Sequence, residues 1–263
     1  MLAGKPRRHS FFLICVSFAF LAVPIAGAAT ITVCGDGSGD YLTIQEGIDA
    51  AVAGDEVVIC PGIYTGNGNR DLDYNGKAIT VRGTDPEDRD VVAATIIDCQ
   101  GSEAEPHRGF KFHSSETADS VLAGLTITNG YGPEEYVDYY PLSRGGAILC
   151  IGSSPSVENC VLGNNSSGDY GGGMYNGQDS NPTLTNCTFS GNCASAPYWY
   201  SGKRGGGMYN ISSNPTLTNC TFSENTAGRH GGGMCNLYSS PTLTNCMFSS
   251  NGATDYDGGG MCN

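Results

Sequence analysis

Basic residues are scarce in this sequence. Its 263 residues include 13 lysines and arginines against 26 aspartates and glutamates, which gives a formal net charge of −13 at pH 7. This excess of negative charge repels phosphate groups, so we expect no nucleic-acid partner and no attraction to anionic membranes. The sequence also lacks any apolar run beyond the N-terminus that is long enough to cross a membrane.

The one long apolar run is N-terminal. Three basic residues precede a stretch from Phe11 to Val23 that is too short to span a bilayer, and small residues follow it at 26–28. This order is typical of a signal peptide, which we assign to residues 1–29. We therefore expect a secreted or cell-surface protein, whose mature chain keeps 10 basic and 26 acidic residues.

Most of the mature chain shows no helical periodicity. It contains a sequence repeat instead. Glycine is abundant, with 39 residues, about twice its average share. Four repeats align on a proline: SPSVENCVLGNN from Ser154, NPTLTNCTFSGN from Asn181, NPTLTNCTFSEN from Asn214 and SPTLTNCMFSSN from Ser240. Each follows a Gly-Gly unit, and the period is 26 or 27 residues apart from one step of 33. Short β-prone runs at such a period predict a β-solenoid.

Alternation of side chains along each strand places like residues in columns. The expected interior columns are Met174, Met208, Met234 and Met261; Val157, Leu184, Leu217 and Leu243; and Cys160, Cys187, Cys220 and Cys246. We expect the cysteine column to hold free thiols, because stacked Cβ vectors run parallel and do not point at each other. Cys235 and Cys262 have the opposite parity to the methionines and are expected to face outward.

An asparagine marks a bend between the leucine and cysteine columns. The two positions are an odd number of residues apart, so both face inward only if the chain turns between them. Asparagine tolerates the left-handed conformation that such a turn needs. We therefore predict a ladder of stacked amides formed by Asn159, Asn186, Asn219 and Asn245.

The segment before the repeats is expected to close one end of the solenoid. Thr43 and Glu46 match a helix capping box, and three apolar residues ending at Val52 form one face. A short helix here would cover the open end of the stack. Cys34 and Cys60, near this end, are the candidate disulfide.

The domain, residues 30–263, divides into two parts. Residues 30–130 hold the cap and irregular early coils, and 131–263 hold the regular repeats. The last unit, GGGMCN from Gly258, begins a coil that the sequence does not complete. We therefore expect a truncated chain whose uncapped last coil self-associates.

Two groups of motifs resemble known families. DGSGDY from Asp36, with TIQE from Thr43 and PGIY from Pro61, resembles the opening of pectin methylesterases and, more broadly, of proteins with the pectin-lyase-like fold. GGAI from Gly145 and the F-x-x-N runs of the repeats resemble chlamydial polymorphic outer-membrane proteins, which are surface adhesins. The resemblance implies an all-β fold, a right-handed parallel β-helix with a short N-terminal capping helix. Esterase activity is not expected, because the family's Q-A-V-A-L-R, D-F-I-F-G and L-G-R-P-W motifs are absent.

Two insertions precede Gly-Gly units at the same corner of the coil, Tyr131–Arg144 and Cys193–Arg204. Two coils apart, they are expected to flank a groove with Tyr170 on its floor. Aromatic faces suit sugar rings. The candidate carbohydrate-binding residues are Tyr139, Tyr140, Tyr170, Tyr198, Trp199 and Tyr200. The alternative is that these aromatics only pack their own loops onto the solenoid.

Catalytic residues are not identified by any motif. The candidates are Asp169, Arg144 and Arg204, because one carboxylate would lie between two arginines of neighbouring coils. A solvated charge ladder explains the same pattern. No metal or cofactor site is predicted, although a lyase would need calcium.

The sequence therefore favours an exported, non-catalytic protein that binds extracellular or cell-surface polysaccharide or acts as an adhesin-like module. A polysaccharide lyase or glycoside hydrolase of the same fold is the first alternative. A purely structural stalk is the second.

Overall fold

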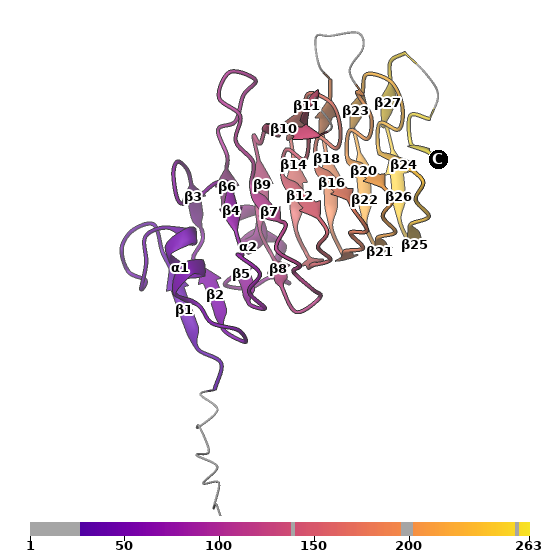
Figure 1. Cartoon of the computed structure of the whole chain (residues 1–263). Helices are drawn as coiled ribbons and strands as arrows, with labels where there is room; N and C mark the ends of the chain where they lie inside the picture. The colour runs from indigo at the N-terminus through magenta and orange to yellow at the C-terminus, as the bar shows by residue number, and fades with distance from the viewer. Residues whose placement is uncertain (1–26, 138–139, 196–201, 256–257) are drawn as a thin grey trace, which may run out of the picture.

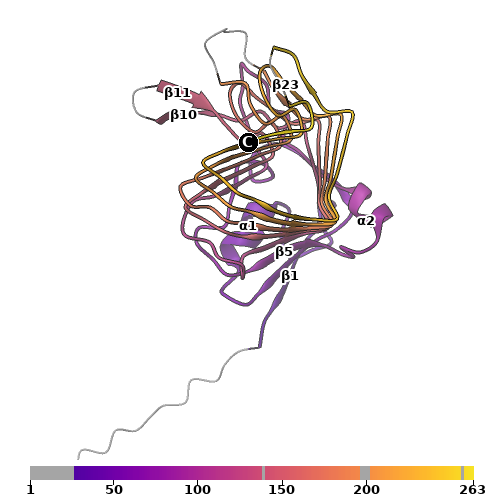
Figure 2. The same ribbon diagram turned by 90° about the vertical axis from the view of Figure 1, so that its right-hand side faces the viewer.

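The computed structural model describes residues 27–137, 140–195, 202–255 and 258–263. These segments form one stack of coils, seen from the side in Figure 1 and end-on in Figure 2. Four parallel sheets, A to D, run along the stack, and each regular coil passes through C, A, B and D in turn. The predicted right-handed parallel β-helix is confirmed. Within the described segments, no helix has the length and apolar character needed to span a membrane.

The strands are short and are ordered along the stack. Sheet A contains β1 (Thr30–Val33), β2 (Glu56–Ile59), β5 (Thr80–Gly83), β8 (Val121–Ala123), β13 (Ser156–Glu158), β17 (Thr183–Thr185), β21 (Thr216–Thr218) and β25 (Thr242–Thr244). Sheet B contains β3 (Gly62–Tyr64), β6 (Thr95–Asp98), β9 (Thr126–Thr128), β14 (Val161–Gly163), β18 (Thr188–Ser190), β22 (Thr221–Ser223) and β26 (Met247–Ser249). Sheet C contains β4 (Leu72–Asp73), β7 (Phe110–Phe112), β12 (Ile148–Ile151), β16 (Met174–Gly177), β20 (Met208–Ile211), β24 (Met234–Leu237) and β28 (Met261–Cys262). Sheet D contains β15 (Ser166–Ser167), β19 (Cys193–Ala194), β23 (Thr226–Ala227) and β27 (Gly252–Ala253).

The register stacks like residues on one another. In sheet C, Met174 pairs with Met208, which pairs with Met234. In sheet A, Leu184 pairs with Leu217. Adjacent strands lie about 4.8 Å apart, so a repeat of constant length brings identical side chains into van der Waals contact. The predicted columns are confirmed, and their members are buried except at the end of the stack, where Met261 is 39% exposed and Leu243 and Cys246 are partly buried. The cysteines of the third column are free thiols.

The predicted asparagine ladder lies at the bend between sheets A and B. Asn186 donates its side-chain amide to Asn159 at 3.0 Å, and Asn219 donates to Asn186 at 3.1 Å. Asn245 continues the ladder at 3.3 Å. All four residues have φ between 52° and 55°, the left-handed conformation that the turn requires.

Two further asparagine ladders lie inside the stack, and the sequence did not predict them. One follows the F-x-x-N runs and contains Asn165, Asn192, Asn225 and Asn251; the other lies in and beside sheet C and contains Asn176, Asn210, Asn236 and Asn263. Asn192 and Asn225 are fully buried. Asn192 and Asn225 each bond to the coils on either side, which satisfies their buried amides.

Helix α1 (Ile44–Ala50) covers the N-terminal end of the stack, as predicted. Its capping box joins Thr43 and Glu46, and Ile48 is fully buried. The helix ends before Val52, which is 66% exposed, so the predicted apolar face is one turn shorter than expected. A second helix, α2 (Arg89–Ala94), was not predicted; it lies beside the bend between sheets A and B.

The cysteines differ in their surroundings. Cys34 and Cys60 form a disulfide between the first two coils, with Cα atoms 5.0 Å apart. Cys235 and Cys262 lie on the opposite side of sheet C from the methionines, as their parity predicts. Cys235 is nevertheless only 4% exposed, because it packs in a second apolar cluster with Tyr209.

Candidate functional site

The first insertion forms a hairpin at the corner before sheet C. Strands β10 (Glu134–Val137) and β11 (Tyr140–Ser143) pair antiparallel and project from the stack in Figure 2. Half of the second insertion, residues 196–201 with Tyr198, Trp199 and Tyr200, lies outside the described residues, as does Tyr139. Of Tyr140, only the backbone is described.

Asp169 joins the bases of the two insertions. Its carboxylate accepts a main-chain N–H from Ser143 at 2.9 Å and another from Gly202 at 3.2 Å. The residue is 8% exposed. Asp169 lies between Arg144 and Arg204 along the chain path, but its two oxygens bond to these backbone groups. The observed contacts give Asp169 a positioning role for the loops.

Tyr170 belongs to a row of three tyrosines on the outer side of sheet C. Its ring stacks on Tyr209 with centroids 4.6 Å apart, and Tyr209 lies 5.8 Å from Tyr175. Burial raises the pKa of Tyr170 and of Tyr209, so both phenols are uncharged at neutral pH. Tyr170 is half-buried, because Gly202 packs so closely over it that an added Cβ would overlap the ring. Arg204, five residues before Tyr209 in the same coil, hydrogen-bonds Tyr209.

A cluster of cations lies beside this row, and the sequence did not reveal it. Glu135 of the hairpin pairs with three side chains: Arg108 at 3.2 Å, Lys111 at 3.3 Å and Arg144 at 3.0 Å. The side chains of Arg108 and Arg144 are 2% and 7% exposed, whereas Lys111 is 36% exposed. Burial raises the pKa of Glu135, but the three cations together lower it below its usual value. Three positive charges of the cluster share one hairpin carboxylate, and Asp71 adds a further negative charge beside Arg108.

Two histidine–aspartate pairs continue the polar surface toward the N-terminal end of sheet C. His113 Nε2 lies 2.7 Å from Asp73 Oδ2, and His107 Nδ1 lies 2.6 Å from Asp71 Oδ2. Asp73 is the register partner of Lys111, so these pairs and the cation cluster form one surface. We call this surface, together with the tyrosine row, the sheet C face. Its members come from several coils and a hairpin, which explains why no local motif announced it.

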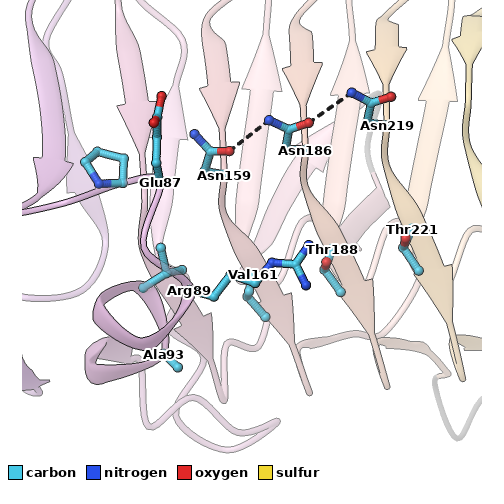
Figure 3. Close-up of a pocket in the computed structure, with 11 residues that line it drawn as sticks. Glu87, Arg89, Ala93, Asn159, Val161, Asn186, Thr188, Asn219 and Thr221 are labelled. Carbon is cyan, nitrogen blue, oxygen red and sulfur yellow. Dashed lines mark hydrogen bonds between the residues drawn. The ribbon is translucent and has the colours of Figure 1, made fainter.

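A groove lies on the side of the stack where sheets A and B meet, away from the sheet C face. It has a volume of about 650 Å³ and lies between the α2 segment, with Glu87 and Arg89, and the exterior asparagine ladder, as Figure 3 shows. The ladder amides already bond to one another along its wall. In the described part of the chain, no three His, Cys, Asp or Glu side chains are grouped to hold a metal ion.

Comparisons with known proteins give information about the fold alone. No protein-family model matches the sequence, and no curated protein matches it. A pectin methylesterase from carrot is 14% identical, with a TM-score of 0.41 over 84% of this chain; the chain spans 65% of that protein's length. Pectate lyase Pel9A is 12% identical, with a TM-score of 0.32 over 89% of this chain and 79% of its own. Neither comparison supports the adhesin resemblance, and these low values carry no argument about activity. The chain is similar to them as a parallel β-helix, an assignment that rests on its own strand registers.

Proposed function

We propose that this protein is exported and binds an acidic extracellular polysaccharide on the sheet C face. The observation that carries the proposal is the convergence of Arg108, Lys111 and Arg144 on a single carboxylate. Burying several cations close together costs free energy, and a bound anion would offset that cost. Uronate sugars carry one carboxylate per ring and so match such a surface.

The exposed fractions of the side chains show which part of the sheet C face a ligand can reach. Lys111 is the most exposed cation, while Arg108 and Arg144 are held in place by Glu135. Tyr170 is the most exposed member of the tyrosine row. Tyr209 and Gly202 pack against its ring, so a sugar would meet the exposed edge of the ring. Tyr175 and Tyr209 are too buried to contact a ligand and support this floor.

The test is a charge reversal at Lys111. Wild-type protein and Lys111→Glu would be titrated with polygalacturonate and with a neutral glucan by calorimetry. We expect Lys111→Glu to weaken polygalacturonate binding by about tenfold or more, because a screened attraction becomes a repulsion. The matched control is Arg89→Glu, the same charge change on α2, across the stack in Figure 2. Equal binding by both variants, or no binding by the wild type, contradicts the proposal.

An enzyme acting on the same polymer is the second candidate, favoured by the histidine–aspartate pairs. A histidine oriented by a carboxylate is a general base at neutral pH. From polygalacturonate, a lyase would release unsaturated ends and a hydrolase would release reducing ends. Both products would be measured with and without calcium. The variant His113→Asn would abolish the release of either product. A binding protein binds the polymer without cleaving it. A structural stalk neither binds nor cleaves the polymer.

A further inference from the structure

One outward column of sheet C changes its residue type along the stack. The second, third, fourth and fifth Gly-Gly units read GGGMYN, GGGMYN, GGGMCN and GGGMCN. The register stacks Tyr175 on Tyr209, Tyr209 on Cys235, and Cys235 on Cys262. In two neighbouring coils, cysteine therefore occupies the position that tyrosine holds in the preceding coils. This places Cys235 and Cys262 next to each other.

The two thiols are in contact. The side chain of Cys235 hydrogen-bonds that of Cys262. The first two coils show that this stacking permits a covalent bond. Cys34 and Cys60 also follow paired residues of adjacent strands, and they form a disulfide with Cα atoms 5.0 Å apart. Cysteines at equivalent positions of adjacent coils can therefore form a disulfide in this fold, as the predicted Cys34–Cys60 bond does.

Access distinguishes Cys262 from the fully buried interior cysteines. Cys262 is half-buried on the outer side of sheet C, so an oxidant reaches it. The hydrogen bond from Cys235, and more weakly Arg204, lower the pKa of Cys262, which favours the reactive thiolate. In the interior column, Cys187 and Cys220 are each only 1% exposed. Burial raises the pKa of Cys160 in that column to about 12, whereas a side-chain hydrogen bond from Cys187 lowers the pKa of Cys220. The difference between Cys262 and Cys220 is therefore one of access and not of pKa.

We infer that Cys235 and Cys262 are a redox-active pair that closes into a second disulfide between coils, fastening β28 to β24. The oxidant is an external disulfide, from a small molecule or a thiol oxidoreductase. The Cys262 thiolate attacks it, forms a mixed disulfide and displaces one thiolate. Cys235 then loses its proton and attacks Cys262 Sγ, which releases the second thiolate. Two thiols give up two protons and two electrons, and the oxidant leaves as two thiols.

Peptide mapping tests the bond directly. The full chain would be purified without reductant, its free thiols alkylated, and then cut after Arg229 and Tyr238 and before Asp257. We expect HGGGMCNLY, from His230, joined to DGGGMCN, from Asp257, by a bond that reductant breaks. Alkylated Cys235 and Cys262 in protein exposed to a glutathione disulfide buffer, or a bond to Cys246 instead, overturns the inference.

Limited proteolysis of the last coil gives a second measurement. Oxidation is expected to slow its cleavage by about tenfold or more in the wild type, because the bond suppresses local opening. Cys262→Ser should lose this redox dependence. The matched control Cys246→Ser, a free thiol in the same coil as Cys235, should keep it. Redox-independent cleavage of the wild type overturns the inference even if both variants fold.

Discussion

The buried amide of Asn225 offers the sharpest test of what holds the coils together. Its Oδ1 accepts two hydrogen bonds from Asn192, from the backbone N–H at 3.0 Å and from Nδ2 at 2.9 Å. Its Nδ2 donates to the carbonyl of Phe189 and to Asn251 Oδ1, both at 2.9 Å. Replacement of Asn225 by leucine keeps a similar volume but removes all four bonds and leaves their partners buried.

The expected loss of stability follows from that count. At about 1 kcal/mol of net stabilisation per hydrogen bond, four bonds account for about 4 kcal/mol, and buried partners without bonds add to the cost. Asn219→Gly is the matched control in the exterior ladder. It also removes two amide bonds, but water replaces them, and glycine keeps the positive φ of 55° at low cost. We expect that control to lose less than about 1 kcal/mol.

The assay is urea-induced unfolding followed by far-UV circular dichroism, from which the free energy of unfolding of each variant is obtained. A loss in Asn225→Leu no larger than that in Asn219→Gly would refute the reasoning. It would mean that the interior ladder adds nothing beyond the exterior one and that the apolar columns alone order the coils.

Two further predictions concern the hairpin and the last coil. Because the cations lower the pKa of folded Glu135, its contribution to stability is full above the unfolded pKa, about 4.3, and is lost as pH falls through the folded value. Glu135→Gln should therefore lower the melting temperature at pH 7 and flatten its fall in acid; an unchanged profile contradicts this. The last coil exposes Met261 by 39% and Met247 by 56% beside unpaired strand edges, so we expect the 263-residue chain to self-associate there. Sedimentation should show Met261→Lys shifted toward monomer, with Val52→Lys, an exposed residue just after α1 at the other end of the stack, as control. A wild type that is monomeric at all concentrations contradicts the prediction.

Much of the scaffold was predictable because the repeat is local. Each coil carries the same β-prone runs, so the period and the alternation of side chains place Met208 on Met174 and Leu217 on Leu184 without knowledge of the whole chain. The exterior asparagines were predictable for the same reason: the odd spacing between Leu184 and Cys187 requires a bend. These inferences need only the geometry of a strand and the conformational preferences of asparagine.

The sheet C face was decided by the tertiary structure. Glu135 meets Arg108 from another coil only because the hairpin folds against sheet C, and no spacing in the sequence encodes that approach. The contacts of Asp169 with Ser143 and Gly202 depend likewise on where two insertions return to the stack. The sequence by itself determined the repeating coil, since period and alternation are properties of neighbouring residues. Only the folded chain decided which charges meet, because such contacts join residues from different coils at distances that the period does not specify.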